Sequence, residues 1–360
     1  MTHADLPQAL VTGGTIGILG GGQLGRMLSV AAARLGYRTH IYDPGAHPPA
    51  GQVAQDVTTA AFDDVAALER FAAMVDIITY EFENIPTRAL DLLQDRRPIN
   101  PGRQALWVSQ DRLVEKRFLR DLGLATAPFV PVASPEDLTA ALAQVGMPSI
   151  LKTRRFGYDG KGQARLETGD DYEAAHRSLG HAPCILEALV PFVCEVSVII
   201  ARDHLGASRC YDVPRNEHVN GILRRSFVPA NVDARVADRS CRAATALADA
   251  LDYVGVLALE FFVLADGSLL ANEFAPRVHN SGHWTPEACA TGQFEQHVRA
   301  VAGWPLGDVT RFHDVEMANL LGDEALAAPE DLLEDAVLTL YGKRDAKPGR
   351  KMGHLVKRLS

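Results

Sequence analysis

The chain has 360 residues, of which 47% are hydrophobic and 22% are charged, so it is long enough for two or three domains with a large core. Its formal net charge of −9 argues against non-specific nucleic-acid binding, and basic clusters are therefore interpreted as local anion sites. No apolar run reaches the ~18 residues of a membrane-spanning helix, the N-terminus lacks a secretory signal, and the five cysteines form no C-x-x-C motif. This composition predicts a cytoplasmic protein without a nucleic-acid or membrane partner.

The first third of the chain alternates predicted strands and helices. Residues 1–12 are expected to form a loose leader. Strands are predicted at 15–19, 39–42 and 76–80, and helices at 26–35, 63–73 and 87–94. This βαβ order predicts an N-terminal α/β domain with a parallel sheet, spanning residues 13–108.

A glycine-rich turn, Gly20-Gly-Gly-Gln-Leu-Gly25, connects the first strand to the first helix, and Asp43 follows about 20 residues later. Formally this is the dinucleotide-binding fingerprint. Physically it indicates that backbone N–H groups at a helix N-terminus can hold an anion, either NAD or a sugar phosphate. Glu81 and Glu83 are predicted to share one face at the end of a strand, where open α/β sheets bind ligands, although a solvated strand end is an alternative.

Residues 109–305 are predicted to form a second domain with a small lid subdomain at about 129–190. Its expected helices are 109–123, 135–145, 170–179 and 236–252, and its first strands are 149–153, 163–166, 184–189, 193–201 and 207–213. The loop from Phe156 to Gln163 contains three glycines and can close over phosphates, with Lys161 facing the charge. A flexible hairpin tip with a solvated lysine is the alternative. Lys152 favours phosphate binding, because a lysine at the edge of an apolar strand needs a partner.

Two glutamates are predicted to face each other across a hairpin. Its strands are expected at 256–264 and 269–274, with a two-residue turn at Asp266-Gly267 that pairs Ala265 with Ser268. This register places Glu260 opposite Glu273, with Cβ atoms roughly 4.5–5.5 Å apart, where like charges repel. Mg²⁺ between the carboxylates would relieve the repulsion. An exposed glutamate beside one that is protonated or paired with arginine is the alternative.

The segment after the hairpin concentrates polar groups. Arg277, His279 and Asn280 are interpreted as donors to an anionic substrate, whereas the His279/His283 spacing lacks a third ligand for zinc. Residues 306–360 are expected to form a short C-terminal domain with a basic loop at 342–351.

Six segments together resemble the ATP-grasp superfamily and, within it, the N5-carboxyaminoimidazole ribonucleotide synthetases. These segments are Gly20–Leu28, Tyr80–Asn84, Gln110–Arg112, Gly157–Gln163, Asn272–Trp284 and Pro348–His354. The resemblance implies an α/β fold, α+β in its centre, with an N-terminal parallel-sheet domain before the ATP-grasp domain, a mobile lid and a short C-terminal domain. Phe156 stands where glycine is expected, and the chain ends soon after His354; these two features depart from the family pattern.

The family resemblance implies ATP-dependent carboxylation of 5-aminoimidazole ribonucleotide with bicarbonate. The reaction would pass through carboxyphosphate and give N5-carboxyaminoimidazole ribonucleotide, ADP and phosphate, in de novo purine biosynthesis. The implied partners are these small molecules and a second copy of the chain in a homodimer.

The same resemblance implies residues for each ligand. ATP would be held by Arg112, Lys152, Gly157, Tyr158, Asp159, Gly160, Lys161, Gly162, Gln163, Glu187, Ala188, Leu189, Val190, Glu195, His218, Asn272 and Glu273. Mg²⁺, with Mn²⁺ as an alternative, would be held by Glu260 and Glu273. The substrate and bicarbonate would be surrounded by Gln23, Leu24, Glu81, Tyr158, Asp159, Lys161, Arg277, His279, Asn280, Lys343, Arg350 and Lys351. Catalytic roles would fall to Glu81, Asp159, Lys161, Arg277 and His279.

Three alternatives remain at this point. A nicotinamide-dependent dehydrogenase rests only on the glycine-rich turn and Asp43, and it leaves the glutamate pair unexplained. A catalytically silent nucleotide-binding regulator would not need the full set of candidate ligands. Sister ATP-grasp enzymes, such as glycinamide ribonucleotide synthetases or formate-dependent transformylases, are the nearer competitors.

Overall fold

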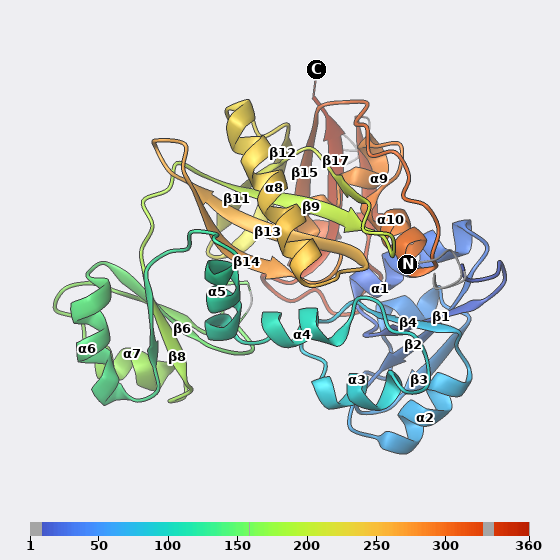
Figure 1. Ribbon diagram of the computed structural model, residues 1–360, viewed down its shortest axis with the longest axis horizontal. Helices are drawn as coiled ribbons and strands as arrows, with labels where there is room; N and C mark the ends of the chain where they lie inside the picture. Colours follow the sequence, from blue (N-terminus) through green and yellow to red (C-terminus); the bar gives the residue numbers. More distant parts are fainter. Residues whose placement is uncertain (1–8, 158, 327–334, 360) are drawn as a thin grey trace.

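The computed structural model describes residues 9–157, 159–326 and 335–359 (Figure 1). Most of the expected leader lies outside these ranges. Its described end is anchored, because the Leu10 backbone N–H donates to the Ala302 carbonyl over 2.8 Å and the Tyr37 hydroxyl donates to the Leu10 carbonyl over 2.9 Å. The loose leader over residues 1–12 stays a prediction, although Leu10 itself is held by these two hydrogen bonds.

The N-terminal part is a four-stranded parallel sheet covered by helices, as its alternating pattern predicts. Its strands lie in the order β3-β2-β1-β4. The strands are β1 (Thr15–Leu19), β2 (Arg38–Asp43), β3 (Asp56–Thr59) and β4 (Ile77–Tyr80), and the helices are α1 (Gln23–Arg34), α2 (Val65–Ala73), α3 (Thr87–Leu93) and α4 (Arg103–Ser109), with a 3-10 turn at Pro49–Gln52. β1 is buried along its whole length, as expected for a central strand of a parallel sheet.

The lid is a separate four-stranded antiparallel sheet with its own apolar core. Its strands, in spatial order, are β5 (Phe129–Val132), β8 (Cys184–Ala188), β6 (Ser149–Thr153) and β7 (Gln163–Leu166), and its helices are α6 (Pro135–Val145) and α7 (Tyr172–Ser178). Figure 1 shows this small unit projecting from the rest of the molecule.

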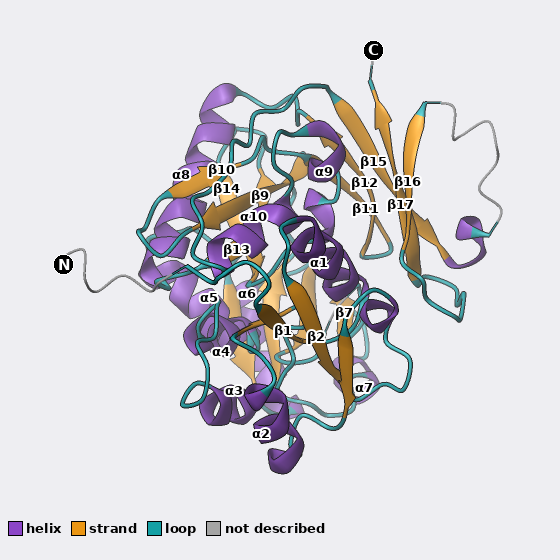
Figure 2. Cartoon of the chain, turned by 90° about the vertical axis from the view of Figure 1, so that its right-hand side faces the viewer, coloured by secondary structure: helices purple, strands orange, loops and turns teal. Residues whose placement is uncertain are grey.

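A nine-stranded sheet forms the largest part of the protein, in the order β14-β13-β9-β11-β12-β15-β17-β16, with β10 paired to β9. Its strands are β9 (Cys194–Arg202), β10 (Ser208–Cys210), β11 (Arg215–Val219), β12 (Ile222–Val228), β13 (Gly255–Val263), β14 (Leu269–Ala275), β15 (Val315–Leu321), β16 (Ala336–Leu340) and β17 (Lys351–Arg358). Figure 2 shows the last three strands continuing the sheet beside β12. The C-terminal segment therefore shares the hydrogen bonds of the central sheet.

Helices flank this sheet on both sides. They are α5 (Arg112–Asp121), α8 (Ala234–Ala250), α9 (Thr285–Ala288) and α10 (Gln293–Val301), with 3-10 turns at Asn280–Gly282 and Gly322–Ala325. The helix predicted over 109–123 is present as α5, but it begins later than predicted, because Asp111 caps its start by accepting the Leu113 backbone N–H over 2.9 Å.

No helix in the described ranges is both long enough and apolar enough to cross a membrane. All five cysteines are free thiols.

Candidate active site

A cavity of about 220 Å³ opens between the lid and the central sheet. It is lined by most of the predicted nucleotide and metal residues, namely Arg112, Lys152, Asp159, Gly160, Lys161, Gln163, Glu187, Ala188, Leu189, Val190, Glu195, His218, Glu260, Asn272 and Glu273. Gly157 and Gly162 belong to the same loop without lining the cavity, and Tyr158 lies outside the described residues. Sequence analysis missed four further lining residues, Ile150, Phe192, Gly221 and Phe262.

The two glutamates meet in this cavity, although the predicted hairpin turn is wrong. Leu264 pairs with Ser268 across a three-residue turn, so the first strand pairs, such as Phe261 with Ala271, are displaced by one residue. A β-bulge opposite Glu260 then restores the predicted alignment, and Leu259 pairs with Phe274. The shift caused by the longer turn and the shift caused by the bulge cancel each other. Glu260 therefore lies opposite the bulge that contains Glu273.

The two carboxylates of the pair have different environments. Burial would raise the pKa of Glu273, but Arg112 donates to its Oε2 from 2.6 Å and the pKa is lowered to about 2. Burial, together with the charge of Glu273, raises the pKa of Glu260 to about 7. The alternative in which one glutamate is paired with arginine is therefore present at Glu273. The other glutamate has a histidine neighbour, because His279 Nε2 lies 3.6 Å from Glu260 Oε1.

The oxygen atoms around the pair fit a hard divalent cation. Asn272 precedes Glu273 and lines the same cavity, and its buried Oδ1 has no hydrogen-bond partner. Two carboxylates and an amide oxygen beside a phosphate-sized cavity are the donors that Mg²⁺ prefers. Among the described residues, no three His, Cys, Asp or Glu side chains gather as a metal cluster.

Buried charges behind the cavity form a second group. Glu187 Oε2 lies 3.0 Å from Lys152 Nζ and 3.4 Å from Lys116 Nζ. Burial would raise the pKa of Glu187, but the two lysines outweigh it and lower the pKa to about 2. Sequence analysis missed Lys116 and its neighbour Glu115; a usable signal was that they follow Arg112 by three and four positions, on the same helical face.

Three contacts hold the lid loop near the central sheet. Arg112 Nη2 donates to the Gly157 carbonyl over 3.4 Å, and Lys351 Nζ donates to Asp159 Oδ1 over 2.7 Å. Gly160 packs so closely on Gly221, in the turn between β11 and β12, that a Cβ at either position would overlap backbone of the other turn. Phe156, the departure from the family pattern, adopts φ 63°, a conformation that favours glycine.

The glycine-rich turn differs from its prediction, because protein carboxylates already occupy its amides. Glu81 accepts the Gly22 N–H over 2.8 Å and the Gly25 N–H over 3.3 Å. Asp43 accepts the Gly21 N–H over 2.7 Å. The turn is therefore closed by its own anions, which weakens its interpretation as a phosphate or NAD cradle.

The predicted shared strand face of Glu81 and Glu83 is also wrong, since β4 ends at Tyr80. Glu81 turns to the glycine amides, whereas Glu83 Oε2 accepts the Arg277 Nε–H over 2.6 Å. Burial raises the pKa of Glu81.

The basic C-terminal loop reaches the N-terminal part. Gln52 Nε2 donates to the Gly342 carbonyl over 2.7 Å, and Arg26 donates to Gln52 Oε1 over 2.8 Å. Lys343 Nζ donates to the Lys351 carbonyl over 2.7 Å, and burial together with the charge of Arg350 lowers the pKa of Lys343 to about 8.

Gln23 and Leu24, the other predicted substrate residues, begin α1. Gln23 is half-buried, whereas the Leu24 side chain packs in the apolar core. A substrate contact by the Leu24 side chain is therefore not supported.

The histidine segment after the hairpin is fixed by buried hydrogen bonds. Asn280 and Asn319 exchange amide hydrogen bonds of 2.9 and 2.8 Å, so the Asn280 side chain, which was predicted to donate to a substrate, is engaged with protein instead. His283 Nδ1 lies 3.0 Å from the Tyr341 hydroxyl. Burial and the nearby Arg277 lower the pKa of His279 to about 3, so this imidazole is neutral.

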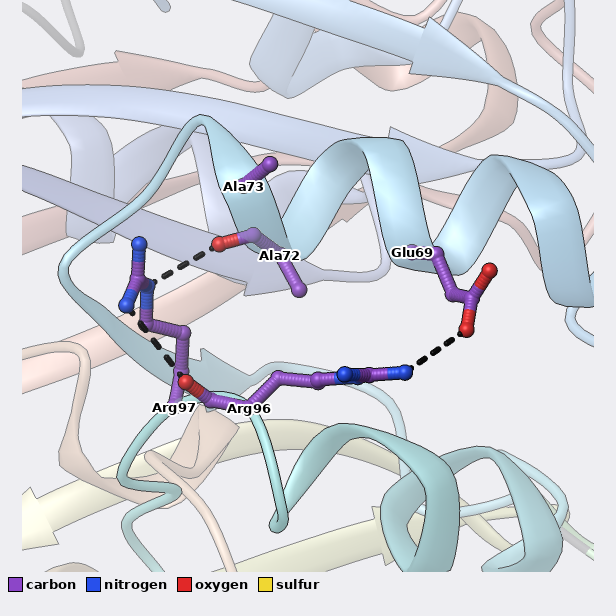
Figure 3. Close-up of a pocket in the computed structure, with 5 residues that line it drawn as sticks. All are labelled: Glu69, Ala72, Ala73, Arg96 and Arg97. Carbon is purple, nitrogen blue, oxygen red and sulfur yellow. Dashed lines mark hydrogen bonds and ion pairs between the residues drawn. The ribbon is translucent and has the colours of Figure 1, made fainter.

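A second hollow, of about 340 Å³, lies on the N-terminal part and contains none of the predicted residues (Figure 3). Arg97 Nε donates to the carbonyls of Ala72 and Val75 at the end of α2, and Arg96 pairs with Glu69 at 2.9 Å. These arginines cap a helix and form a surface ion pair, so their donors are engaged within the protein.

Three family models together match most of the chain. The ribonucleotide synthetase preATP-grasp domain matches residues 14–110, the ATP-grasp domain matches 117–294, and the phosphoribosylaminoimidazole carboxylase C-terminal domain matches 316–357. The N5-carboxyaminoimidazole ribonucleotide synthase of Brucella melitensis is 54% identical over 352 residues, which are 97% of each chain. The chain belongs to the N5-carboxyaminoimidazole ribonucleotide synthetase family.

Other relatives in the synthetase family agree. The synthase of Bacillus subtilis is 44% identical over 97% of this chain and 92% of its own length. A synthetase crystallised with ADP is 43% identical, with a TM-score of 0.95 over 98% of this chain and 94% of its own. The enzyme of Aspergillus clavatus, crystallised with ADP and 5-aminoimidazole ribonucleotide, is 31% identical, with a TM-score of 0.91 over 97% of this chain and 94% of its own. The chain is therefore an ATP-grasp ligase, and its predicted fold class is confirmed.

Proposed function

We propose that this ligase carboxylates 5-aminoimidazole ribonucleotide with bicarbonate, using ATP, to give N5-carboxyaminoimidazole ribonucleotide, ADP and phosphate. Membership of the synthetase family supports the overall reaction. The observation that carries it in the structure is the 2.7 Å contact between Lys351 and Asp159. This contact joins the lid loop of the nucleotide cavity to the basic loop beside the N-terminal sheet, so two ligands can meet there.

The cavity residues act first on ATP and bicarbonate. Bicarbonate oxygen attacks the γ-phosphate, and Lys152, Lys161 and Arg112 neutralise the charge that spreads over the phosphoryl oxygens. Glu260, Glu273 and Asn272 would hold Mg²⁺, or Mn²⁺, which supplies further neutralisation when bound. Closure of the lid loop excludes water, which would hydrolyse the carboxyphosphate product.

The second ligand is held between the C-terminal loop and the N-terminal sheet. Lys343, Arg350 and Lys351 bind the 5′-phosphate of the ribonucleotide, because charge-assisted contacts to phosphate are the strong kind. The neutral His279 and the buried Glu81 face the reacting groups as hydrogen-bond partners. Carboxyphosphate delivers its carboxyl group as CO₂ to the exocyclic amine, and phosphate departs.

The remaining expectations also belong to this proposal. The enzyme works in the cytoplasm as a homodimer. Its N-terminal domain spans 13–108, its ATP-grasp domain 109–305 and its C-terminal domain 306–360.

A coupled ATPase assay across candidate amines and acids tests the proposal. We expect ADP release only when 5-aminoimidazole ribonucleotide and bicarbonate are both present, with the carboxylated amine as product. Equal turnover with glycinamide ribonucleotide, or with formate in place of bicarbonate, would assign the chain to a sister activity. A change in absorbance at the nicotinamide wavelength would instead support a dehydrogenase.

A further inference from the structure

The β-bulge in β14 delivers two consecutive side chains to the cavity. In an unbroken strand, successive side chains alternate between the two faces. Here Ala271 and Phe274 both pack in the core beneath the sheet, while Asn272 and Glu273 between them both line the cavity. Without the bulge, the register of Phe261 with Ala271 would continue and would turn Glu273 into the core.

The bulge also redirects backbone amides. β14 is the edge strand of the sheet, so alternate N–H groups point away from β13. The Ala271 N–H meets the Ala125 carbonyl at 2.7 Å on this outer side. In a regular strand, the next N–H groups to point away from β13 would be those of residues 273 and 275. The extra residue of the bulge changes this alternation, so that the Phe274 N–H points outward instead.

Glu115 meets that redirected amide. Its Oε1 accepts the Phe274 N–H over 2.7 Å, and the glutamate is 2% exposed. One turn earlier on the same helix, Arg112 grips the side chain of Glu273. Helix α5 thus holds both the side chain in the bulge and the backbone directly after it. A buried amide without an acceptor is costly, so the bulge depends on this carboxyl oxygen.

We propose that Glu115 is a positioning residue for the metal-binding face of β14. By accepting the Phe274 amide it keeps the bulge in place, and the bulge keeps Glu273 and Asn272 facing Glu260. This inference rests on the proposed divalent cation at that pair. Glu115 contributes an acceptor oxygen at the end of a side chain of a particular length. The amide of glutamine, which has the same length, should therefore accept the Phe274 N–H, whereas the shorter carboxylate of aspartate should not reach it.

Mn²⁺ binding in the presence of ADP, followed by electron paramagnetic resonance, tests the inference without turnover. Glu115→Ala is expected to weaken Mn²⁺ affinity by roughly 10- to 100-fold, the usual effect of removing an outer-shell partner. Glu115→Gln should bind within a few-fold of the wild type. Glu115→Asp, which keeps the charge but withdraws the oxygen, should fall between Gln and Ala and remains informative if the alanine variant does not fold.

Arg120→Ala is the matched control. Arg120 lies on the same helix and donates to Thr126 Oγ1 and to the Ala127 carbonyl, beside the same edge strand. Its loss should lower thermal stability and leave the Mn²⁺ affinity unchanged. The positioning role would be overturned if Glu115→Ala bound Mn²⁺ as tightly as Arg120→Ala. It would also be overturned if Glu115→Asp bound Mn²⁺ normally while Glu115→Gln bound it more weakly. A wild-type protein that binds no Mn²⁺ would overturn the metal site itself, and the inference with it.

Discussion

At the scale of single residues, the cavity is charged but internally paired before any ligand enters. Arg112 holds Glu273, and Lys152 holds Glu187. Glu187 is buried, where a charge without a partner is strongly unfavourable, so its pairing with Lys152 stabilises the folded protein. In the proposed reaction, the phosphates of ATP can take the place of the carboxylates beside Arg112 and Lys152, and the cation can take the place of Arg112 beside Glu273.

Glu273→Gln should reduce turnover by orders of magnitude while the protein stays folded. The amide removes one anionic ligand of the proposed cation but can still accept from Arg112. Relief of the repulsion with Glu260 offsets the weaker arginine contact, so the melting temperature without ligand should change little. Turnover measured across a Mg²⁺ titration checks this; normal activity at limiting Mg²⁺ would contradict the metal assignment.

Arg350→Ala should raise the KM for 5-aminoimidazole ribonucleotide far more than the KM for ATP. Losing one charged contact to a phosphate costs about 1.5–3 kcal/mol, or roughly 10- to 150-fold. Arg350 also donates to the Asp345 carbonyl over 3.0 Å, so the loop must be shown to stay folded. Arg344→Ala, in the same loop, is the control. An unchanged substrate KM would identify Arg350 as a solvated turn residue.

At the scale of elements, the lid loop meets the central sheet through a close backbone contact as well as through the side chains of Arg112 and Lys351. The Gly160 and Gly221 turns approach so closely that a Cβ on Gly221 would lie 2.5 Å from Gly160 Cα. No L side chain fits there without moving one turn. The position of the lid loop therefore depends on a glycine outside the lid.

Gly221→Ala should keep the lid loop from closing. We expect a lower kcat and weaker protection of the loop from protease by an ATP analogue. Gly146→Ala is the control, because Gly146 also has a positive φ, of 84°, but nothing lies within 4 Å of its added Cβ. Both variants place an alanine at a positive φ, which costs about 1–3 kcal/mol of backbone strain. If both lose protection equally, the Gly160–Gly221 contact does not govern closure.

The same elements show what the sequence can predict. β1, α6, β6 and β7 agree with their predicted bounds because strong apolar periodicity and turn residues mark them. β11 and β12 were missed, since Arg215–Val219 and Ile222–Val228 carry many charged side chains, which local patterns assign to loops. Their strand structure depends on neighbours in a sheet that forms only in the folded chain.

In the candidate site, too, residues marked by local patterns could be predicted, whereas residues placed by distant contacts could not. Local motifs identified Lys152, the glycine-rich lid loop and the glutamate pair, because glycines, lysines and glutamates in such patterns are typical of a phosphate site, whereas the family resemblance implied Arg112, Glu187 to Val190, Glu195, His218 and Asn272. Glu115 and Lys116 escaped, because charged residues on a helix normally face solvent. Their burial follows from partners far away in the sequence, since Lys116 pairs with Glu187, 71 positions later, and Glu115 accepts from Phe274, 159 positions later. The sequence also could not predict that the amides of the glycine-rich turn are bound by a protein carboxylate, since Glu81 lies 59 positions from Gly22.

At the scale of the whole molecule, buried neutral histidines join the parts. His297 accepts the Val256 N–H at Nδ1 over 3.1 Å, and its Nε2 lies 2.8 Å from Thr79 Oγ1, so it links the nine-stranded sheet to the N-terminal sheet. His354 lies 2.9 Å from the Tyr341 hydroxyl within the C-terminal strands. Burial lowers the pKa of each of these histidines to about 3.

Acid should therefore destabilise the protein. The folded pKa values lie below the unfolded value of about 6.5, so the unfolded state takes up protons first as the pH falls. Stability is complete above pH ~6.5 and decreases toward pH ~3, by about 1.4 kcal/mol per pH unit for each histidine. Urea unfolding at about pH 7.5 and about pH 5.5 measures this difference. His297→Gln, which cannot titrate, should reduce it by about 1 kcal/mol, and the exposed His47→Gln should not.

The ion pair between Asp159 and Lys351 spans 192 positions of the chain, and this sets an order of events during translation. At about 5–20 residues per second, the lid loop leaves the ribosome roughly 10–40 s before its lysine partner is made. Throughout that interval the growing polypeptide lacks the group that draws the loop inward, and the later cavity residues, Glu260 and Glu273 among them, are still being made. The ion pair that draws the lid loop inward can therefore form only after Lys351, the first residue of β17, has been made.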